Sequence, residues 1–271
     1  MQKFGIDISK WQGSFDFDAA IREGVEFVII KGGGGDSGLY VDSAFGRNYT
    51  EAKRRGLPVG VYWFSKALTV SEARNEAAYF YDKCLKGKQY ELPVYIDVEH
   101  KAQLALGRKE LTDIVIAWLE EVQRRGFWVG IYSTPNCFKN EMDDTRLQGY
   151  AHWCAQWSKQ CTYQGNSGVM GVWQFGGETN LLRSTKIAGQ VVDQNYMYID
   201  YPKLIKAAGL NGFGKTAAAA PEKPKLKSVD EIAREVIAGK WGVGADRKRR
   251  LQAAGYDYAA VQKKVNDIMK K

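Results

Sequence analysis

Short apolar runs alternate with amphipathic segments along the first 150 residues of the chain. The runs are bounded by Gly, Pro and polar residues, as buried strands usually are, and the segments between them repeat apolar residues at helical spacing. Strands are predicted at 3–9, 25–31, 57–65, 91–99 and 127–133. Helices are predicted at 15–24, 41–56, 69–87 (with Ser71 as its N-cap) and 107–126. Strands that alternate with helices predict parallel βα units, in either a barrel or a doubly wound sheet.

The pattern changes after Tyr150. Three more strands are predicted at 151–157, 168–175 and 190–198, with loops in place of helices between them. An α/β chain that loses its helices in the last third favours a barrel. The stretch 209–228 is rich in Gly, Ala, Lys and Pro and is predicted to be a flexible linker. The predicted organisation is therefore a barrel over 1–208, a linker over 209–228 and a module of two or three short helices over 229–271.

The composition is that of a soluble globular protein, with 45% hydrophobic and 26% charged residues. No apolar run reaches the roughly 18 residues of a membrane span. Met1 leads directly into the first predicted strand, so no signal peptide is expected and synthesis in a cytoplasm is predicted. Four Cys without CxxC spacing and only two His argue against a zinc site and predict reduced, structural thiols. No metal and no cofactor are expected.

The net charge of +8 is concentrated at the C-terminal end. From Gly209 onward the chain has fourteen Lys and Arg against seven Asp and Glu, whereas the first 208 residues are nearly neutral. A basic tail favours an anionic polymer as partner: nucleic acid, a membrane surface or a cell wall. The aromatic content of 13% is compatible with a site that stacks sugars or bases, and equally with an ordinary core.

Two glycine-rich stretches resemble phosphate-binding loops. The first, GLNGFGKT at 209–216, has Walker A spacing, but that loop needs a strand before it and a helix after it. A predicted helix precedes it and an Ala-rich stretch follows, so nucleotide binding is rejected. The second, KGGGGD at 31–36, lacks the GxGxxG spacing and a following helix. It is predicted to be a flexible glycine loop at the C-terminal mouth of the barrel.

Two carboxylates close the predicted strand 91–99. Side chains alternate along a strand, so Asp97 and Glu99 point the same way, at the end of the strand where parallel α/β folds place their chemistry. Repulsion between them would raise one pKa and leave a proton donor beside an ionised partner. The simpler interpretation is two solvated acids at a strand end.

More acids and aromatic residues favour the chemical interpretation. Asp7 lies in the first strand and Asp193 in the last, and these two strands are neighbours if the barrel closes. Four carboxylates would then converge at one mouth. The aromatic residues expected around them are Tyr62, Tyr132, Trp153, Trp157 and Trp173. Acids surrounded by aromatic rings are typical of a sugar-binding cleft, in which one acid protonates a glycosidic oxygen.

These stretches together resemble family 25 of the glycoside hydrolases, the lysozyme-type muramidases of phage endolysins and bacterial autolysins. The motifs that carry the resemblance are FGIDISKWQG, GVEFVIIK, GLPVGVYWF, LPVYIDVE, GIYS, WCAQW, VWQF and VDQN, over roughly residues 4–205. The resemblance implies an α/β fold, a flattened (β/α)5β3 barrel. It also implies cleavage of the β-1,4 bond between N-acetylmuramic acid and N-acetylglucosamine in peptidoglycan.

The resemblance assigns a role to each matching residue. Glu99 matches the general acid and Asp97 its partner carboxylate, while Asp7 and Asp193 match two flanking acids. The predicted substrate-binding residues are Tyr62, Tyr132, Trp153, Trp157, Lys31 and Gln174. The close spacing of Asp97 and Glu99 on one predicted strand favours retention of configuration, because a water between the acids needs a wider gap. The resemblance also implies that the substrate's own N-acetyl group attacks, oriented or charged by Asp97. Two departures concern subsite contacts: Lys31 lacks the Glu that usually follows it, which leaves the role of Asp36 open, and Trp63 stands where His is common.

The C-terminal module has a resemblance of its own. VIAGKWGVG, AAGYDY and VQKKVN are similar to the short cell-wall-binding repeat of certain phage lysozymes, there usually in tandem and here in one copy. This implies a three-helix bundle that binds peptidoglycan, with Trp241, Arg247 and Tyr256 as predicted cell-wall-binding residues. Charges that alternate with a regular apolar face argue against a nucleic-acid-binding tail.

The sequence therefore predicts a modular muramidase that causes cell lysis. Its expected partner is bacterial peptidoglycan, without nucleic acid or stable membrane association, and its oligomeric state is left open. It is expected to be made in the host cytoplasm and to act on the cell wall, either as a phage lysin released through a holin pore or after export by another route. The alternatives are a catalytically silent peptidoglycan-binding protein on the same fold, and a chitinase-like glycosidase.

Overall fold

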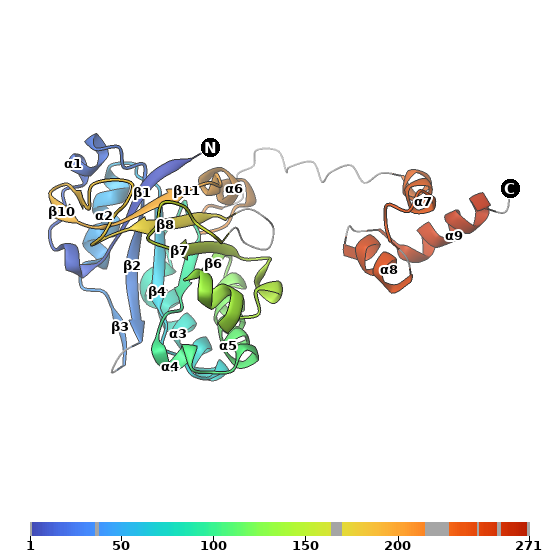
Figure 1. The fold of residues 1–271 in the computed structure, drawn as a ribbon, viewed down its shortest axis with the longest axis horizontal. Coiled ribbons are helices and arrows are strands. Elements are labelled where there is room, and N and C mark those ends of the chain that lie inside the picture. The colour runs from blue at the N-terminus through green and yellow to red at the C-terminus, as the bar shows by residue number, and fades with distance from the viewer. Residues whose placement is uncertain are drawn as a thin grey trace. The chain divides into compact units, whose positions relative to one another are not determined.

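The chain divides into two compact units, Met1–Thr216 and Ala217–Lys271 (Figure 1). The computed structural model describes residues 2–35, 38–163, 170–214, 228–242, 244–253 and 256–269. Each unit has its own core of buried apolar side chains.

A nine-stranded sheet in the described part of the chain forms the centre of the first unit. Its strands are β1 (Lys3–Ile8), β2 (Phe27–Gly35), β3 (Leu39–Val41), β4 (Val59–Phe64), β5 (Val94–Asp97), β6 (Val129–Ser133), β7 (Ala151–Ala155), β8 (Val172–Gly176) and β11 (Asp193–Met197). Their order is β1-β11-β8-β7-β6-β5-β4-β2-β3, and β1 also pairs with β2. This extra pairing closes eight strands into a barrel, while β3 pairs with β2 outside the closed ring. A separate hairpin consists of β9 (Lys186–Ile187) and β10 (Gln190–Val191).

Strand direction gives the barrel one chemically distinct end. β1, β2 and β4 to β8 run parallel, and β11 is antiparallel to both of its neighbours, β1 and β8. The C-terminal ends of the seven parallel strands therefore lie at one end, here called the mouth. The predicted fold class, a (β/α)5β3 barrel followed by a helical region, is confirmed.

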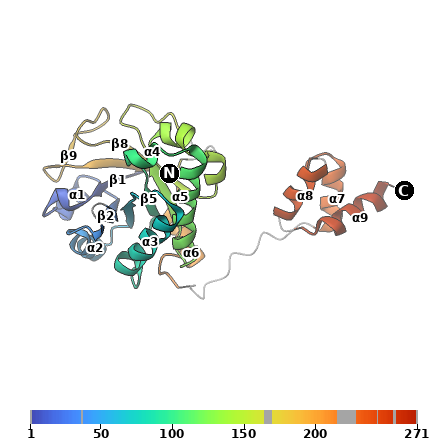
Figure 2. The ribbon, with the colours of Figure 1, turned by 90° about the horizontal axis from the view of Figure 1, so that it is seen from below.

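Helices surround the barrel (Figures 1 and 2). They are α1 (Phe17–Arg22), α2 (Phe45–Arg54), α3 (Val70–Phe80), α4 (Lys101–Leu104), α5 (Arg108–Gln123) and α6 (Tyr201–Ala208). Single turns of other helix types are η1 (Lys10–Gln12), η2 (Tyr81–Leu85), η3 (Cys137–Glu141) and η4 (Asp144–Leu147). Helix α3 continues into η2 and packs beside α5.

Alternation along the strands separates two hydrophobic clusters. In β5, Val94 and Ile96 belong to the cluster shared with the helices, whereas Tyr95 belongs to a second cluster together with residues such as Trp153. The second cluster fills the barrel interior. Because successive side chains of a strand alternate, Asp97 follows Tyr95 onto the inner side. The strand that packs the core thus also aims a carboxylate at the mouth.

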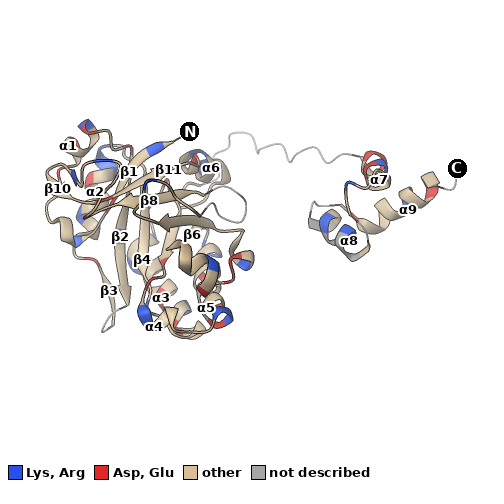
Figure 3. Ribbon diagram, viewed as in Figure 1, with Lys and Arg blue, Asp and Glu red and all other residues tan. Residues whose placement is uncertain are grey.

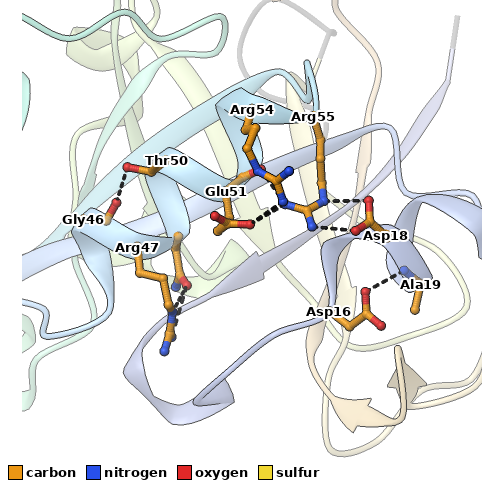
Figure 4. Close-up of polar contacts among 10 residues, drawn as sticks. Asp16, Asp18, Ala19, Gly46, Arg47, Thr50, Glu51, Arg54 and Arg55 are labelled. Carbon is orange, nitrogen blue, oxygen red and sulfur yellow. Dashed lines mark hydrogen bonds and ion pairs between the residues drawn. The ribbon is translucent and has the colours of Figure 1, made fainter.

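Ion pairs connect the first two helices (Figure 4). The Arg55 guanidinium, at the C-terminal end of α2, donates to both carboxylate oxygens of Asp18 at 2.5 and 2.7 Å and to Glu51 at 2.5 Å. These hydrogen bonds lower the pKa of Asp18 and of Glu51. Asp16 caps α1 by accepting from the backbone N–H of Ala19. The network fixes α1 against α2.

The predicted glycine loop is wrong for the described residues Lys31–Gly35. These residues continue β2, and Gly33, Gly34 and Gly35 pair with β3. A methyl group at Gly33 would lie 2.0 Å from the Tyr40 carbonyl oxygen, and one at Gly34 would lie 2.7 Å from the Phe64 carbonyl oxygen. Close backbone approach on both sides, not flexibility, requires glycine here. Asp36 lies outside the described residues.

Two predicted boundaries also need correction. Helix α3 is capped by Thr69, not Ser71: the Thr69 hydroxyl accepts from the backbone N–H of Glu72. The first residues of the predicted linker belong to the barrel, because the Asn211 side chain donates to the carbonyl oxygens of Tyr90 and Leu92. A single-sequence pattern does not reveal such long-range contacts.

The second unit is a bundle of three helices in its described residues. They are α7 (Val229–Ile237), α8 (Gly244–Ala253) and α9 (Tyr258–Met269). Ile232, Leu251 and Val261 are among the buried residues of its core. Ser228 caps α7 in a capping box with Glu231. Lys and Arg are prominent on α8 (Figure 3).

Candidate active site

The acidic residues lie on three strands and one loop at the barrel mouth. Asp7 on β1 stands opposite Asp193 at the start of β11, in register across the antiparallel pair. Asp97 is the last residue of β5 and is buried. Glu99 lies two residues beyond the strand, not on it as predicted, and is exposed. The sheet thus holds the Asp97 carboxyl group, while the neighbouring Glu99 carboxyl group reaches into solvent.

Asp7 is held by two side-chain amides. Its Oδ2 accepts from Gln174 Nε2 at 3.0 Å and from Asn195 Nδ2 at 2.8 Å. Both amides come from the neighbouring strands β8 and β11, where Asn195 and Gln174 are register partners. Their hydrogen bonds stabilise the charged form of a carboxylate that burial would otherwise disfavour.

Aromatic N–H and O–H groups orient those two amides in turn. The Gln174 Oε1 accepts from the Tyr132 hydroxyl at 3.0 Å and from Trp157 Nε1 at 3.1 Å. The Asn195 Oδ1 accepts from Trp153 Nε1 at 2.8 Å. Since each amide oxygen is occupied by donors, each amide N–H₂ group faces Asp7. Four predicted residues, Gln174, Tyr132, Trp153 and Trp157, therefore belong to one network around an acid.

Burial raises the pKa of all four acids. Desolvation is the main cause in each case; it raises the pKa of Asp7 to about 6 and that of Asp193 to about 8. The pKa of Asp97 lies well above its usual range, because desolvation and the charge of Glu99 act together. The pKa of Glu99 is also raised by partial desolvation, although much of its side chain remains open to solvent. Because these carboxyl groups lie close enough to interact, they titrate together and not independently.

The positively charged Lys31 side chain acts on two of these acids. Its charge lowers the pKa of both Asp97 and Glu99, against the effect of burial. Its ammonium lies 4.9 Å from the centre of the Phe64 ring and 5.7 Å from that of Tyr62. The two rings attract the ammonium and hold it at the mouth. Because the rings carry no net charge, Lys31 remains a full positive charge beside the acids.

Aromatic rings form the floor below the acids. Trp153 is fully buried and makes edge-to-face contacts with Tyr132 at 4.5 Å, Tyr95 at 5.2 Å and Tyr62 at 5.8 Å between ring centres. Trp153 therefore supports the two predicted substrate-contacting tyrosines, Tyr62 and Tyr132, from below. Its burial assigns it a supporting role and not a direct contact with a ligand.

Gly177 allows Asp193 and Trp157 to lie close together. A methyl group at Gly177 would stand 1.9 Å from Asp193 Oδ1 and 2.8 Å from the Trp157 ring. Trp157 is 41% exposed. The indole and the carboxylate therefore form one continuous surface at the mouth, which any larger residue at 177 would disrupt.

The structure thus brings together the predicted catalytic and substrate-binding residues of the first unit. Sequence reasoning missed Asn195, Phe64 and Gly177. Asn195 is part of the VDQN motif two residues after Asp193, so strand alternation could have found it; nothing local marks Phe64 or Gly177.

One carboxylate oxygen in this site is without a hydrogen-bond partner in the part of the chain that the structure describes. Asp97 Oδ1 is buried, and among the described residues no group donates a hydrogen bond to it. Buried acceptors are rarely left unpaired, so this oxygen is placed to receive a donor from a bound molecule. Among the described residues, no group of three or more His, Cys, Asp or Glu could hold a metal ion.

The three predicted cell-wall-binding residues lie together in the second unit. The Trp241 indole contacts the Tyr256 ring edge-to-face at 5.8 Å and donates to Glu235 at 3.0 Å. The Arg247 guanidinium donates to the Gly242 carbonyl oxygen at 3.0 Å and to Gln262 at 3.3 Å. Each side chain is partly exposed, and the rings of Trp241 and Tyr256 also pack against the core of the bundle.

Comparison with known protein families places both units. Residues 6–182 match the model of Glycosyl hydrolases family 25, and residues 230–269 match the CW_7 repeat. The first match covers more than half of the chain and includes Asp7, Asp97 and Glu99. It ends before β11, the strand that carries Asp193 and Asn195. None of the helices in the described ranges is long and apolar enough to cross a membrane.

Individual relatives agree with these matches. The lysozyme of Streptococcus phage Cp-7 is 26% identical over 270 residues, which are 97% of this chain and 69% of that protein. An autolytic lysozyme of Clostridium acetobutylicum is 30% identical over 155 residues, 56% of this chain and 44% of the relative, so this chain spans less than half of its length. The crystal structure of the Streptomyces coelicolor lysozyme superimposes with a TM-score of 0.64 at 23% identity, over 78% of this chain and 98% of that one, which supports the fold.

Proposed function

This chain belongs to family 25 of the glycosyl hydrolases, and on that basis we propose that it is a lysozyme of the endolysin type. Its proposed substrate is bacterial peptidoglycan, in which it hydrolyses the β-1,4 bond between N-acetylmuramic acid and N-acetylglucosamine. The observation that carries the proposal is the acid pair: buried Asp97 beside accessible Glu99, at an aromatic-lined barrel mouth.

Glu99 is the proposed general acid. It is the accessible member of the pair, and its raised pKa keeps it protonated to a higher pH than an ordinary Glu. A bound sugar would displace water from it and raise that pKa further. Glu99 then gives its proton to the glycosidic oxygen while the bond from that oxygen to the anomeric carbon breaks. The leaving sugar departs as a neutral alcohol, and positive charge develops on the anomeric carbon.

Asp97 is the proposed partner of the substrate's acetamido group. Its unpaired, buried Oδ1 can accept the acetamido N–H and hold the acetamido oxygen against the anomeric carbon. Attack by that oxygen forms a cyclic intermediate without a covalent bond to the protein. Water then opens it, delivering its proton to Glu99. Asp7, whose charged form is stabilised by the amides of Gln174 and Asn195, adds negative potential at the mouth, which favours the positively charged transition state. Asp193, whose pKa is raised to about 8, adds to that potential only once it has lost its proton.

Digestion of purified walls tests this function. The full chain should clear a suspension of peptidoglycan and release fragments with new reducing N-acetylmuramic acid ends, identified by borohydride reduction and mass spectrometry. A catalytically silent peptidoglycan-binding protein would bind the walls without producing new reducing ends. A chitinase-like enzyme would instead cleave chitin oligosaccharides and leave the walls intact.

The anomeric configuration of the first product tests the proposed participation of the acetamido group. Two inversions, by the acetamido oxygen and then by water, should give the β-anomer first in proton NMR. Substrate with a free amine in place of the acetamide should react poorly. If the α-anomer forms first, a water attacks directly and the role proposed for Asp97 is wrong, although the substrate would be unchanged.

The second unit is proposed to bind the wall. Trp241 and Tyr256 offer adjoining aromatic surfaces, and Arg247 lies on the same module. Because Arg247 and Trp241 also make internal hydrogen bonds, their replacement by Ala would loosen the bundle as well as remove contacts. Trp241→Phe is the cleaner variant, since it keeps an aromatic ring against Tyr256.

A further inference from the structure

The two most exposed tryptophans of the first unit both lie at the barrel mouth. Of its seven Trp, all of them described, Trp63, Trp118, Trp153 and Trp173 are buried and Trp128 is partly buried. Trp11 is 80% exposed and Trp157 is 41% exposed. Trp157 comes two residues after the end of β7, and Trp11 comes three residues after the end of β1. A chain that otherwise buries its Trp leaves two rings in solvent at the end that carries the acids.

The turn that presents Trp11 is held from several sides. The Trp11 backbone N–H donates to Ser9 Oγ at 3.3 Å within the capping box of Ser9 and Gln12. The backbone N–H of Lys10 donates to buried Asp42 at 3.2 Å, and Gln12 Nε2 donates to the Val191 carbonyl oxygen on β10 at 3.4 Å. The ring therefore stands on a fixed backbone, which lowers the entropic cost of binding something against it.

Trp11 is also close to the acids along the chain. It follows Asp7 by four residues, which limits the separation of their Cα atoms to about 14 Å. Asp7 is in register with Asp193, and Asp193 lies beside Trp157 at Gly177. A row of four side chains thus crosses the mouth. It runs from Trp157, after β7, through Asp193 on β11 and Asp7 on β1 to Trp11. An exposed ring at each end of a row of acids matches an elongated ligand with alternating apolar and polar faces.

We propose that Trp11 is a stacking platform for a peptidoglycan sugar distant from the cleaved bond, so that the mouth binds a longer glycan strand than the acid cluster alone. This inference rests on the proposed muramidase function. The C–H face of an N-acetylhexosamine packs on the indole, while its hydroxyl groups stay in water. The Lys10 ammonium, 5.1 Å from the centre of the ring, lies near enough to pair with sugar oxygens or with a lactyl carboxylate. Trp11 holds substrate and takes no part in proton transfer.

Chain-length-dependent kinetics of the full-length protein test the platform. The substrates are peptide-free peptidoglycan oligosaccharides of four and of eight sugars. Trp11→Ala should raise KM for the octasaccharide about threefold to tenfold, the range expected for one lost ring contact, with kcat within about twofold. The tetrasaccharide should be cleaved as by the unchanged protein. Trp11→Phe should recover most of the loss, because it keeps an aromatic face.

Leu204→Ala is the matched control, since Leu204 is 43% exposed on α6 and is not part of the site. It should leave both substrates unaffected. The indole N–H signal of Trp11, assigned in NMR spectra by its loss in Trp11→Phe, should shift on addition of the octasaccharide. Equal kinetics of Trp11→Ala and the unchanged protein on both substrates would overturn the platform, and so would equal losses on both. Failure of the unchanged protein to cleave either oligosaccharide would instead contradict the muramidase function itself.

Discussion

Glu99→Gln is expected to lower the rate of wall cleavage by about 10²–10⁴-fold while leaving the protein folded. Gln keeps the size and hydrogen-bonding shape of Glu but carries no proton that it can transfer. Glu99 is exposed, and among the described residues no hydrogen bond or ion pair from its side chain holds the fold together, so the melting temperature should change little. The rate is measured on soluble glycan fragments, where wall binding does not contribute.

The pH dependence gives this variant a second readout. In the unchanged protein, activity should fall as the pH rises through the raised pKa of Glu99, because the acid then loses its proton before it meets substrate. The residual activity of Glu99→Gln should lack that alkaline limb. Glu110→Gln, the same chemical change at an exposed position on α5, is the control and should behave like the unchanged protein. Near-normal rates for Glu99→Gln would remove Glu99 as general acid.

Removal of the second unit is expected to lower lysis of intact walls about tenfold or more, without slowing cleavage of soluble glycan fragments. A chain ending at Thr216 retains the complete first unit and every residue of the acid cluster. A wall-binding module linked to the enzyme raises the local concentration of substrate, an advantage that disappears when the substrate is small and freely diffusing. Turbidity loss and reducing-end release, measured on both substrates, separate the two effects.

The isolated second unit and the full-length Trp241→Phe variant refine this test. The isolated unit should sediment with purified peptidoglycan. Part of that binding should weaken with salt, because the C-terminal region carries an excess of Lys and Arg, whereas a share due to sugar contacts should persist. Trp241→Phe should bind more weakly and keep the bundle folded, since its ring still packs against Tyr256, although it loses the hydrogen bond to Glu235. Equal lysis of whole cells by the truncated and full chains would show that the unit does not target the wall. Complete loss of binding in moderate salt, together with full competition by nucleic acid, would identify a general polyanion-binding tail.

Local sequence determined much of this protein. Strands and helices place apolar residues at different spacings along the chain, so the first five strands, the four helices between them and the three final strands could be predicted from the pattern. The same pattern predicted two or three C-terminal helices, and the resemblance to the cell-wall-binding repeat implied three. Asp97 could be placed at the mouth because it ends a buried strand, and the C-terminal ends of parallel strands gather at one end of a barrel. Asp7 and Asp193 could be paired because closing a barrel makes its first and last strands neighbours.

Only the tertiary structure decided what surrounds each of these groups. The sequence pattern predicts a flexible loop at Gly33 and Gly34, whereas in the structure the neighbouring strands β3 and β4 approach their backbone closely from both sides. The composition predicts a linker from Gly209 onward, whereas the Asn211 side chain donates hydrogen bonds to carbonyl oxygens more than 100 residues away in the barrel. Distances between strands far apart in the chain determine three further features of the site. These are the amide pair that holds Asp7, the unpaired oxygen of Asp97 and the solvent exposure of Trp11. Burial and hydrogen bonding act through space, and a one-dimensional pattern records only the residues next to one another along the backbone.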